Sequence, residues 1–289
     1  MRTGIDSIPI VAMTREMGSL GRDVAASIAA RHGRRVAYHE IIDPLANRMR
    51  LRKSHVVGLL EGRARLWEKL TTDRTSLSIY TADETFRLLT DGETGVVRSW
   101  GAAHLLAAVP HVVRVRVCAP LELRVERMME RLGTGDRDAV RREIELSEEA
   151  HTAICRRHFG VNWRDPEQYD IVLSTARMSV DECTEELERV MAMPRFQPTD
   201  ASLRLVANLA LEWSIRAALR HDPRTANAHV RLECRMAACA SPAASRAPAR
   251  RSTYAKWRLP CRGCARWKTA SRTPFRPAPG CAPRPDLPL

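Results

Sequence analysis

The chain has few aromatic residues and no long apolar run. Phe, Trp and Tyr together make up 5% of its 289 residues. That share disfavours a stacking platform for single-stranded nucleic acid, which relies on aromatic side chains. No run approaches the roughly 20 apolar residues that a membrane-spanning helix needs. The N-terminal segment also lacks the charged, apolar and small-residue order of a signal peptide. We therefore expect a soluble, cytoplasmic protein.

Cysteine is scarce in the first 233 residues, where only Cys118, Cys155 and Cys183 occur. Their wide spacing and apolar or helical surroundings indicate buried thiols in a reducing compartment. Near the C-terminus, Cys261 and Cys264 form one CxxC pair. A structural zinc site needs four ligands, typically two such pairs at regular spacing, so zinc is the less favoured interpretation here.

The net charge of +13 is concentrated at one end of the chain. From Cys234 onward there are twelve Lys or Arg and one Asp, whereas residues 1–233 carry 35 basic and 33 acidic side chains, a net of +2. The body is thus nearly neutral, and nucleic acid is a candidate partner only through the basic tail. The tail is rich in Pro, Ala, Arg and Cys and has little apolar surface to bury, so we expect it to be disordered.

Strand-like and helix-like segments alternate along the first 193 residues. Strands are predicted over residues 7–14, 35–38, 95–97, 111–118 and 169–174, with helical stretches between them. This alternation predicts an α/β fold in three layers, with a parallel sheet covered by helices on both faces. Such sheets bind ligands at the carboxyl ends of their strands.

A glycine-rich loop follows the first predicted strand and precedes a helix. It reads EMGSLGRD over residues 16–23, with Gly18 and Gly21 as its glycines. Backbone N–H groups at such a helix N-terminus attract anions. Against a Walker A loop, Arg22 stands at the lysine position and Asp23 at the hydroxyl position, while Glu16 replaces the first glycine. Taken alone, the match to a Walker motif is weak, and a plain turn is the better interpretation.

The wider pattern resembles the cytidylate-kinase-like family. The matching segments occur in order over residues 14–25, 38–42, 110–131 and 159–175, and the resemblance extends over about residues 8–193. The most specific segment is FGVNWRDPEQYDIVLST, which begins at Phe159. The family implies a P-loop kinase fold with a helical lid. It also implies phosphoryl transfer from ATP to a nucleoside monophosphate with Mg²⁺.

The resemblance assigns the donor side to the glycine loop. Gly18, Ser19, Gly21 and Arg22 would bind the ATP phosphates, since a guanidinium donates paired hydrogen bonds to phosphate oxygens. Asp23 would hold the magnesium ion in place of a hydroxyl.

Further arginines are candidates for the transferred phosphoryl group. Arg127 and Arg131, one helical turn apart, would join Arg22 in offsetting its charge. Their spacing also fits a solvated helix face. Arg156 and Arg157 would close over the substrate from the lid, although surface charge is the more common role of such residues.

Several positions depart from the family pattern. Leu20 stands where glycine is usual, which is unfavourable if the position needs a positive φ. Trp100 replaces an arginine that binds the acceptor phosphate, and Arg98 is a candidate substitute on the same side of its strand. Glu148–His151 replaces an Asp-x-x-Arg motif, and His39 stands at a substrate-side position where Asp is common. A catalytically weak, nucleotide-binding regulatory module is therefore the alternative to an active kinase.

We predict four segments along the chain. Residues 1–193 form the nucleotide-binding domain, and residues 194–200, with two prolines, form a linker. Residues 201–233 resemble the start of a BON domain, a small domain that often follows this kinase-like domain. Residues 234–289 form the basic tail.

Overall fold

The computed structural model describes residues 8–38, 48–49, 74–99, 101–226, 232 and 234. The predictions for His39, Trp100 and the CxxC pair fall outside these residues, and so does the predicted disorder of residues 235–289. These expectations stay predictions.

Five parallel strands form one sheet in the order β2-β3-β1-β4-β5. The strands are β1 (Ile10–Arg15), β2 (Arg35–Ala37), β3 (Thr94–Arg98), β4 (Val112–Cys118) and β5 (Ile171–Ser174). The parallel sheet, with helices on both faces, confirms the predicted α/β class. Because β1 lies at the centre, its carboxyl end and the loop that follows it open at the middle of the sheet edge.

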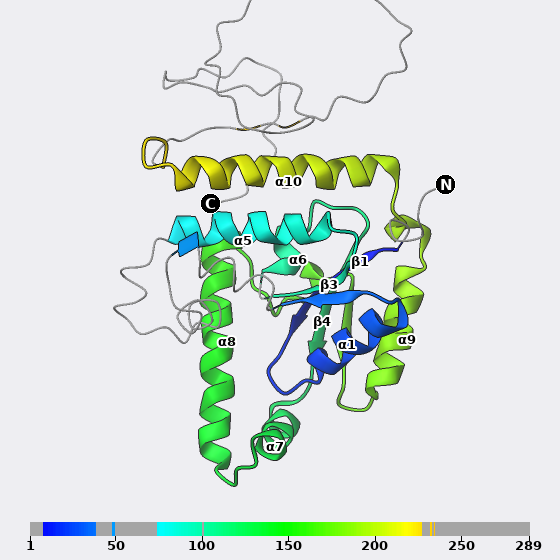
Figure 1. The fold of residues 1–289 in the computed structure, drawn as a ribbon. Coiled ribbons are helices and arrows are strands. Elements are labelled where there is room, and N and C mark those ends of the chain that lie inside the picture. The colour runs from blue at the N-terminus through cyan, green and yellow to red at the C-terminus, as the bar shows by residue number, and fades with distance from the viewer. Residues whose placement is uncertain are drawn as a thin grey trace, which may run out of the picture.

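Helices cover both faces of the sheet (Figure 1). They are α1 (Gly21–Arg31), α5 (Arg74–Leu89), α6 (Ala102–Leu105), α7 (Leu121–Leu132), α8 (Arg137–Phe159), α9 (Val180–Met191) and α10 (Asp200–His221), with 3-10 turns η1 (Pro166–Gln168) and η2 (Pro194–Phe196). Residues of β1 alternate between the two faces, as expected for a strand. Val11 packs with α1 and α9, whereas Ala12 packs with α5, α6 and α10. Both faces are therefore apolar, which explains the unbroken apolar run of β1.

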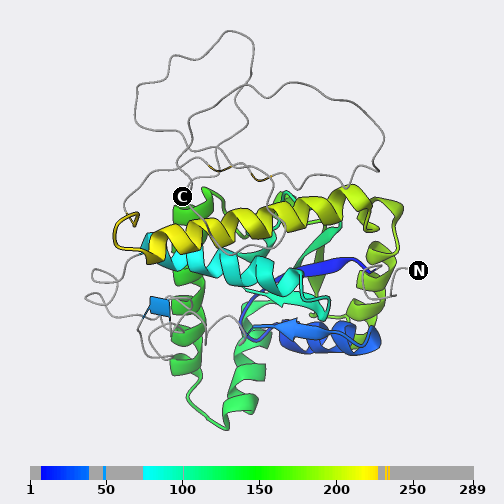
Figure 2. The same cartoon turned by 45° about the horizontal axis from the view of Figure 1, so that its top comes forward.

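Helix α10 lies outside the first 193 residues but packs on the same core. It runs alongside α5 (Figures 1 and 2), and its Val206 is buried with Phe86 of α5. Thr199 caps the helix. Its hydroxyl accepts a hydrogen bond from the Ser202 amide, and the Ser202 hydroxyl accepts one from the Thr199 amide. The predicted linker contains η2, whose Phe196 is buried against the α9 side of the sheet. The predicted domain boundaries and the BON-like segment stay predictions, since few residues beyond α10 are described.

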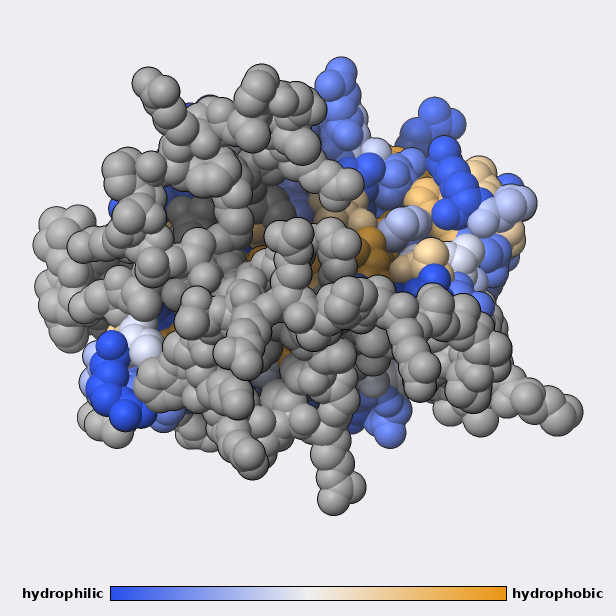
Figure 3. All heavy atoms as spheres, turned by 90° about the horizontal axis from the view of Figure 1, so that it is seen from above, coloured by the Kyte–Doolittle hydropathy of each residue, from blue (hydrophilic) through white to orange (hydrophobic). Residues whose placement is uncertain are grey.

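A second side of α10 is also apolar. Ile215 is buried with Leu232 and Cys234, and Leu211 and Leu219 pack against them. Seen from above, on the side of α10, hydrophobic residues are visible beside hydrophilic ones (Figure 3).

Helices α7 and α8 form an antiparallel hairpin that projects from the sheet, in the place predicted for the lid (Figure 1). Gly133 ends α7 in the left-handed conformation, with φ 62°. Asp136 then caps α8, where its carboxylate accepts a hydrogen bond from the Ala139 amide at 2.9 Å. A small apolar cluster of Val125, Val140 and Ile144 holds the hairpin together.

The described cysteines form no disulfide. Cys155 and Cys183 are buried, as predicted, and Cys118 is partly exposed. Burial raises the pKa of the Cys155 thiol to about 12, so this thiol is protonated at neutral pH. None of the helices in the described residues has the length and hydrophobicity of a membrane span.

The shared core predicts that α10 stabilises the domain. Val206→Ala removes two buried carbons from a side chain that is 4% exposed. The transfer and cavity terms together should lower the free energy of unfolding by about 2 kcal/mol. Leu146→Ala, at a position that is 57% exposed on α8, should change it by less than about 0.5 kcal/mol. Urea unfolding of both variants measures the difference, and equal values would show that α10 does not contribute to the core.

Candidate functional site

The loop between β1 and α1 adopts a backbone path that requires its glycines. Gly18 has φ 80°, and a Cβ there would lie 2.7 Å from the carbonyl oxygen of Arg124. At Gly21 a Cβ would lie 2.7 Å from the Cβ of Arg15. Any side chain at either position would therefore displace backbone or a packed strand residue.

Leu20 has φ 58°, and it is the only non-glycine residue with a positive φ among those the structure describes. The left-handed conformation is unfavourable for leucine by roughly 1–2 kcal/mol. Leu20, which stands where the family usually has glycine, thus lies at a position where glycine would be unstrained.

Ser19 is bound inside the protein. Its Oγ lies 2.8 Å from the Glu16 carbonyl oxygen and 3.0 Å from the Val117 carbonyl oxygen, and its amide donates to Glu16. The predicted phosphate contact of Ser19 would need these bonds to be exchanged. By contrast, the amides of Gly18, Leu20, Gly21 and Arg22 donate to no acceptor among the described residues. Gly21 and Arg22 lie in the first turn of α1, where amides have no acceptor within the helix.

Arg127 supports the loop indirectly, through Thr175. Its two terminal nitrogens donate to the hydroxyl and the carbonyl of Thr175, at 2.9 and 2.8 Å. The Thr175 hydroxyl in turn donates to the Ser19 carbonyl at 2.9 Å. These contacts use two of the five N–H donors of Arg127, and the predicted role of Arg127 toward the transferred phosphoryl group stays a prediction.

Four arginines gather around the carboxyl ends of β1 and β3. Arg15 ends β1, Arg98 ends β3, Arg22 is exposed on α1, and Arg131 is exposed near the end of α7. Burial lowers the pKa of Arg98 to about 10, and the nearby charges of Arg15, Arg22 and Arg131 act in the same direction. Burial also lowers the pKa of Arg15. In the described part of the chain, none of the four is in an ion pair with a carboxylate.

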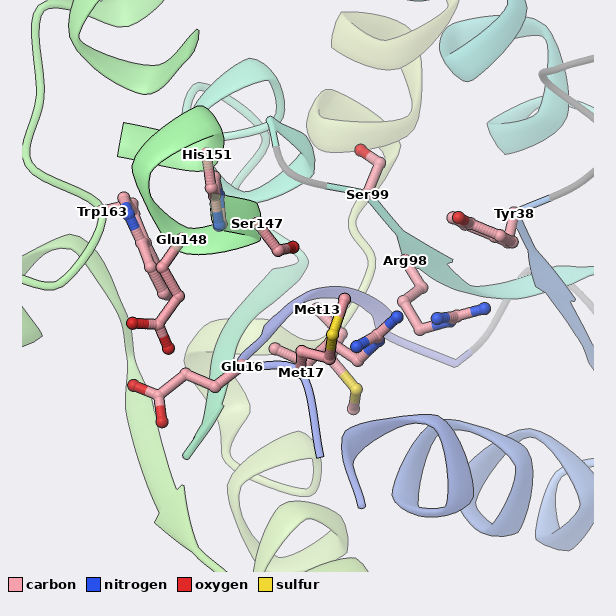
Figure 4. Close-up of a pocket in the computed structure, with 11 residues that line it drawn as sticks. Met13, Glu16, Met17, Tyr38, Arg98, Ser99, Ser147, Glu148, His151 and Trp163 are labelled. Carbon is pink, nitrogen blue, oxygen red and sulfur yellow. The ribbon is translucent and has the colours of Figure 1, made fainter. Parts of the chain in front are cut away.

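Arg98 lies at the centre of a pocket (Figure 4). Its side chain is buried, its guanidinium carbon lies 4.1 Å from the centre of the Tyr38 ring, and its Nε has no hydrogen-bond partner among the described residues. The pocket is lined by Met13, Arg15, Glu16, Met17, Tyr38, Arg98, Ser99, Ser147, Glu148, His151 and Trp163.

The opposite wall of the pocket is acidic and aromatic. Glu148 and His151 point inward from α8, and the His151 ring stacks on Trp163 with 4.0 Å between ring centres (Figure 4). Glu148 accepts hydrogen bonds from Arg124 and Arg164, both at 2.5 Å. The Glu148–His151 segment that departs from the family pattern therefore lines the pocket itself.

The remaining predicted residues lie at the surface. Arg156 and Arg157 are exposed on α8 and do not line this pocket. Asp23 is exposed in the first turn of α1. The described residues contain no group of three metal-ligating side chains, so Asp23 is a lone carboxylate beside the loop. One carboxylate together with nucleotide phosphates is a usual magnesium environment, which fits the predicted role.

Arg15 is the main site residue that the sequence did not identify as functional. It belongs to a matched segment, but the sequence does not show which way a charged side chain at the end of a buried strand points. In the structure Arg15 lines the pocket together with Arg98. Tyr38, directly after the short strand β2, was missed because the sequence does not show the direction of its side chain either.

The geometry of the loop predicts that Leu20→Gly stabilises the protein. Relief of the left-handed strain exceeds the entropy that glycine adds to the unfolded chain, so the free energy of unfolding should rise by about 0.5–1 kcal/mol. Leu20→Ala keeps a Cβ in the same conformation and should give no gain. Chemical denaturation measures both, and an equal response of the two variants would contradict the account of strain.

Comparison with known proteins identifies the family of this chain. The model of the cytidylate kinase-like family matches residues 10–177. A search of curated proteins gave no match.

Similar solved structures include an uncharacterized protein from Eubacterium ventriosum, 18% identical, with TM-score 0.47 and coverage of 63% of this chain and 98% of that one. Shikimate kinase from Acinetobacter baumannii in complex with shikimate is 10% identical, with TM-score 0.38 and coverage of 65% and 94%. TT1252 from Thermus thermophilus is 21% identical, with TM-score 0.39 and coverage of 64% and 100%. Since the family model spans more than half of the sequence, this chain belongs to the cytidylate kinase-like family.

Proposed function

We propose that the chain transfers a phosphoryl group from ATP to a nucleoside monophosphate. The observation that carries this proposal is the arginine cluster, defined as Arg15, Arg22, Arg98 and Arg131. Other arginines nearby are bound: Arg116 to Glu16, Arg124 to Glu148 and Arg127 to Thr175. Like charges placed together at the end of a sheet call for an anion, and a polyphosphate supplies several charges at once.

The donor binds at the loop in this proposal. The amides of Gly18, Gly21 and Arg22 and the positive end of α1 receive the ATP phosphates. Arg22 and Arg131 offset the charge that develops on the transferred group. Magnesium, held by Asp23 together with the phosphates, would supply further charge stabilisation on the phosphate oxygens.

The acceptor binds in the pocket. Arg98 and Arg15 hold its phosphate, and Arg98 takes the role of the arginine that Trp100 replaces. An oxygen of this phosphate attacks the γ-phosphorus of ATP, the bond from that phosphorus to the bridging oxygen breaks, and ADP leaves with the electron pair. His39 remains assigned to substrate binding, and Arg156 and Arg157 would reach the substrate only after a movement of α8.

One observation favours the alternative, a nucleotide-binding regulatory module with little catalytic power. The strain at Leu20 lies in the middle of the loop that must contact the donor phosphates. Where the bound donor needs close approach of the loop backbone, the Leu20 side chain, which glycine lacks, makes binding less favourable.

Arginine substitutions distinguish the two functions. ADP formation from ATP is measured with each nucleoside monophosphate in turn, and ATP binding is measured separately by calorimetry. Arg22→Ala should weaken ATP binding by about tenfold or more, because one charged hydrogen bond is lost. Arg98→Gln should lower kcat/KM for the monophosphate by about 100-fold while leaving ATP binding within about twofold.

Arg141→Gln is the matched control, since Arg141 pairs with Glu122 on the outside of the lid, and it should leave both measurements unchanged. ATP binding without ADP formation for any acceptor would favour the regulatory module. Loss of ATP binding in Arg141→Gln to the same degree as in Arg22→Ala would contradict the assigned site.

A further inference from the structure

Arg124 joins three parts of the molecule that are far apart in the sequence. It lies in the first turn of α7, and its Nε donates to the carbonyl of Ala119 at 2.8 Å. One terminal nitrogen lies 3.3 Å from the Met17 carbonyl of the phosphate loop and 2.5 Å from Oε1 of Glu148 on α8. One buried guanidinium thus contacts the loop, the end of β4 and the lid.

Two carboxylates flank this guanidinium. Oε2 of Glu16 lies 3.5 Å from the Nε of Arg124, and Oε1 accepts a hydrogen bond from Arg116 at 2.6 Å. On the other side, Oε2 of Glu148 accepts from Arg164 at 2.5 Å. The result is a chain of alternating positive and negative side chains, here called the Arg124 network (in order, Arg116, Glu16, Arg124, Glu148 and Arg164).

The side chains at the centre of this network are buried. The side chains of Arg124, Glu16 and Glu148 are 6%, 9% and 11% exposed. Figure 4 shows the carboxylates of Glu16 and Glu148 close together on one side of the pocket. Without the guanidinium between them, the two buried carboxylates would repel each other and separate the loop from α8.

Apolar packing follows the same route. Met17 of the loop packs against the cluster of Val125, Val140 and Ile144 inside the lid hairpin. Gly18 approaches the Arg124 backbone so closely that no side chain fits. Loop and lid therefore meet at Arg124 through charge, backbone contact and hydrophobic contact.

We propose that Arg124 is a positioning residue that holds the phosphate loop and helix α8 in one arrangement, so that a nucleotide bound at the loop also orders the lid over the acceptor pocket. The part that concerns the nucleotide rests on the proposed function, whereas the tether between loop and lid does not. Buried ion pairs contribute geometry more than net stability, which is the role required here.

Hydrogen exchange of the full chain tests the tether without any nucleotide. In Arg124→Gln, exchange should accelerate by about tenfold in two separate segments, residues 16–20 and 144–151, because both lose a charged hydrogen bond. Arg114→Gln is the matched control: Arg114 makes a bidentate ion pair with Asp170, the residue before β5, and no described contact joins it to either segment. It should leave both segments unchanged.

A second variant guards against failure of Arg124→Gln to fold. Glu148→Gln replaces the charged acceptor on α8 by a neutral one and so weakens this contact, while Arg124 keeps its contacts to Ala119 and the loop, so exchange should accelerate over residues 144–151 and remain unchanged over 16–20. Uniform acceleration over the whole protein in either variant, or acceleration confined to α7, would overturn the proposal.

The nucleotide arm uses ATP with Mg²⁺. ATP should slow exchange in both segments of the wild type, but only in residues 16–20 of Arg124→Gln. Arg124→Gln should also raise KM for ATP by about tenfold, whereas Arg114→Gln should leave it within about twofold at a temperature where both are folded. If ATP changes nothing in the wild type, the proposed function fails, and the nucleotide-free comparison still decides the tether. Slowing of both segments by ATP in Arg124→Gln would contradict the coupling.

Discussion

The arrangement of the site depends on two guanidinium groups placed side by side at the carboxyl ends of β1 and β3. Burial lowers the pKa of both Arg15 and Arg98, and the charge of Arg15 lowers the pKa of Arg98 further. Neither has a carboxylate partner in the described part of the chain, although this protein pairs many of its other arginines. Such an arrangement is unfavourable until an anion arrives, and the electrostatic energy it stores becomes available for binding.

The rest of the fold holds these charges in place. Central strand β1 is buried on both faces, so Arg15 leaves it at a fixed point. The loop beyond is secured on one side by the contacts of Ser19, Thr175 and Arg127, and on the other by Arg124. Side chains make most of the contacts that hold the loop, and the amides of Gly18, Leu20, Gly21 and Arg22 donate to no acceptor among the described residues.

Sequence reasoning predicted the strand, glycine loop and helix correctly, because each has a local physical cause. Gly18 and Gly21 were identified from the sequence as the glycines of the loop. The contacts that a Cβ would make there explain why glycine is needed at both positions. Side-chain direction was not predictable. Arg127 and Arg131 have helical spacing, yet Arg127 binds Thr175 while Arg131 belongs to the arginine cluster. Arg15 was missed because its role depends on β3, which is more than 75 residues away in the sequence.

The central claim is that Arg98 serves a ligand rather than the fold, and thermal unfolding of Arg98→Gln with and without a nucleoside monophosphate tests it most directly. Removal of one of two mutually repelling charges should raise the Tm of the ligand-free protein, or at least preserve it. Addition of a nucleoside monophosphate, which raises the Tm of the wild type through mass action, should then have little effect on the variant. A lower Tm of the ligand-free variant, with the response to the monophosphate intact, would contradict the account, because Arg98 would then be part of the fold and not of the site.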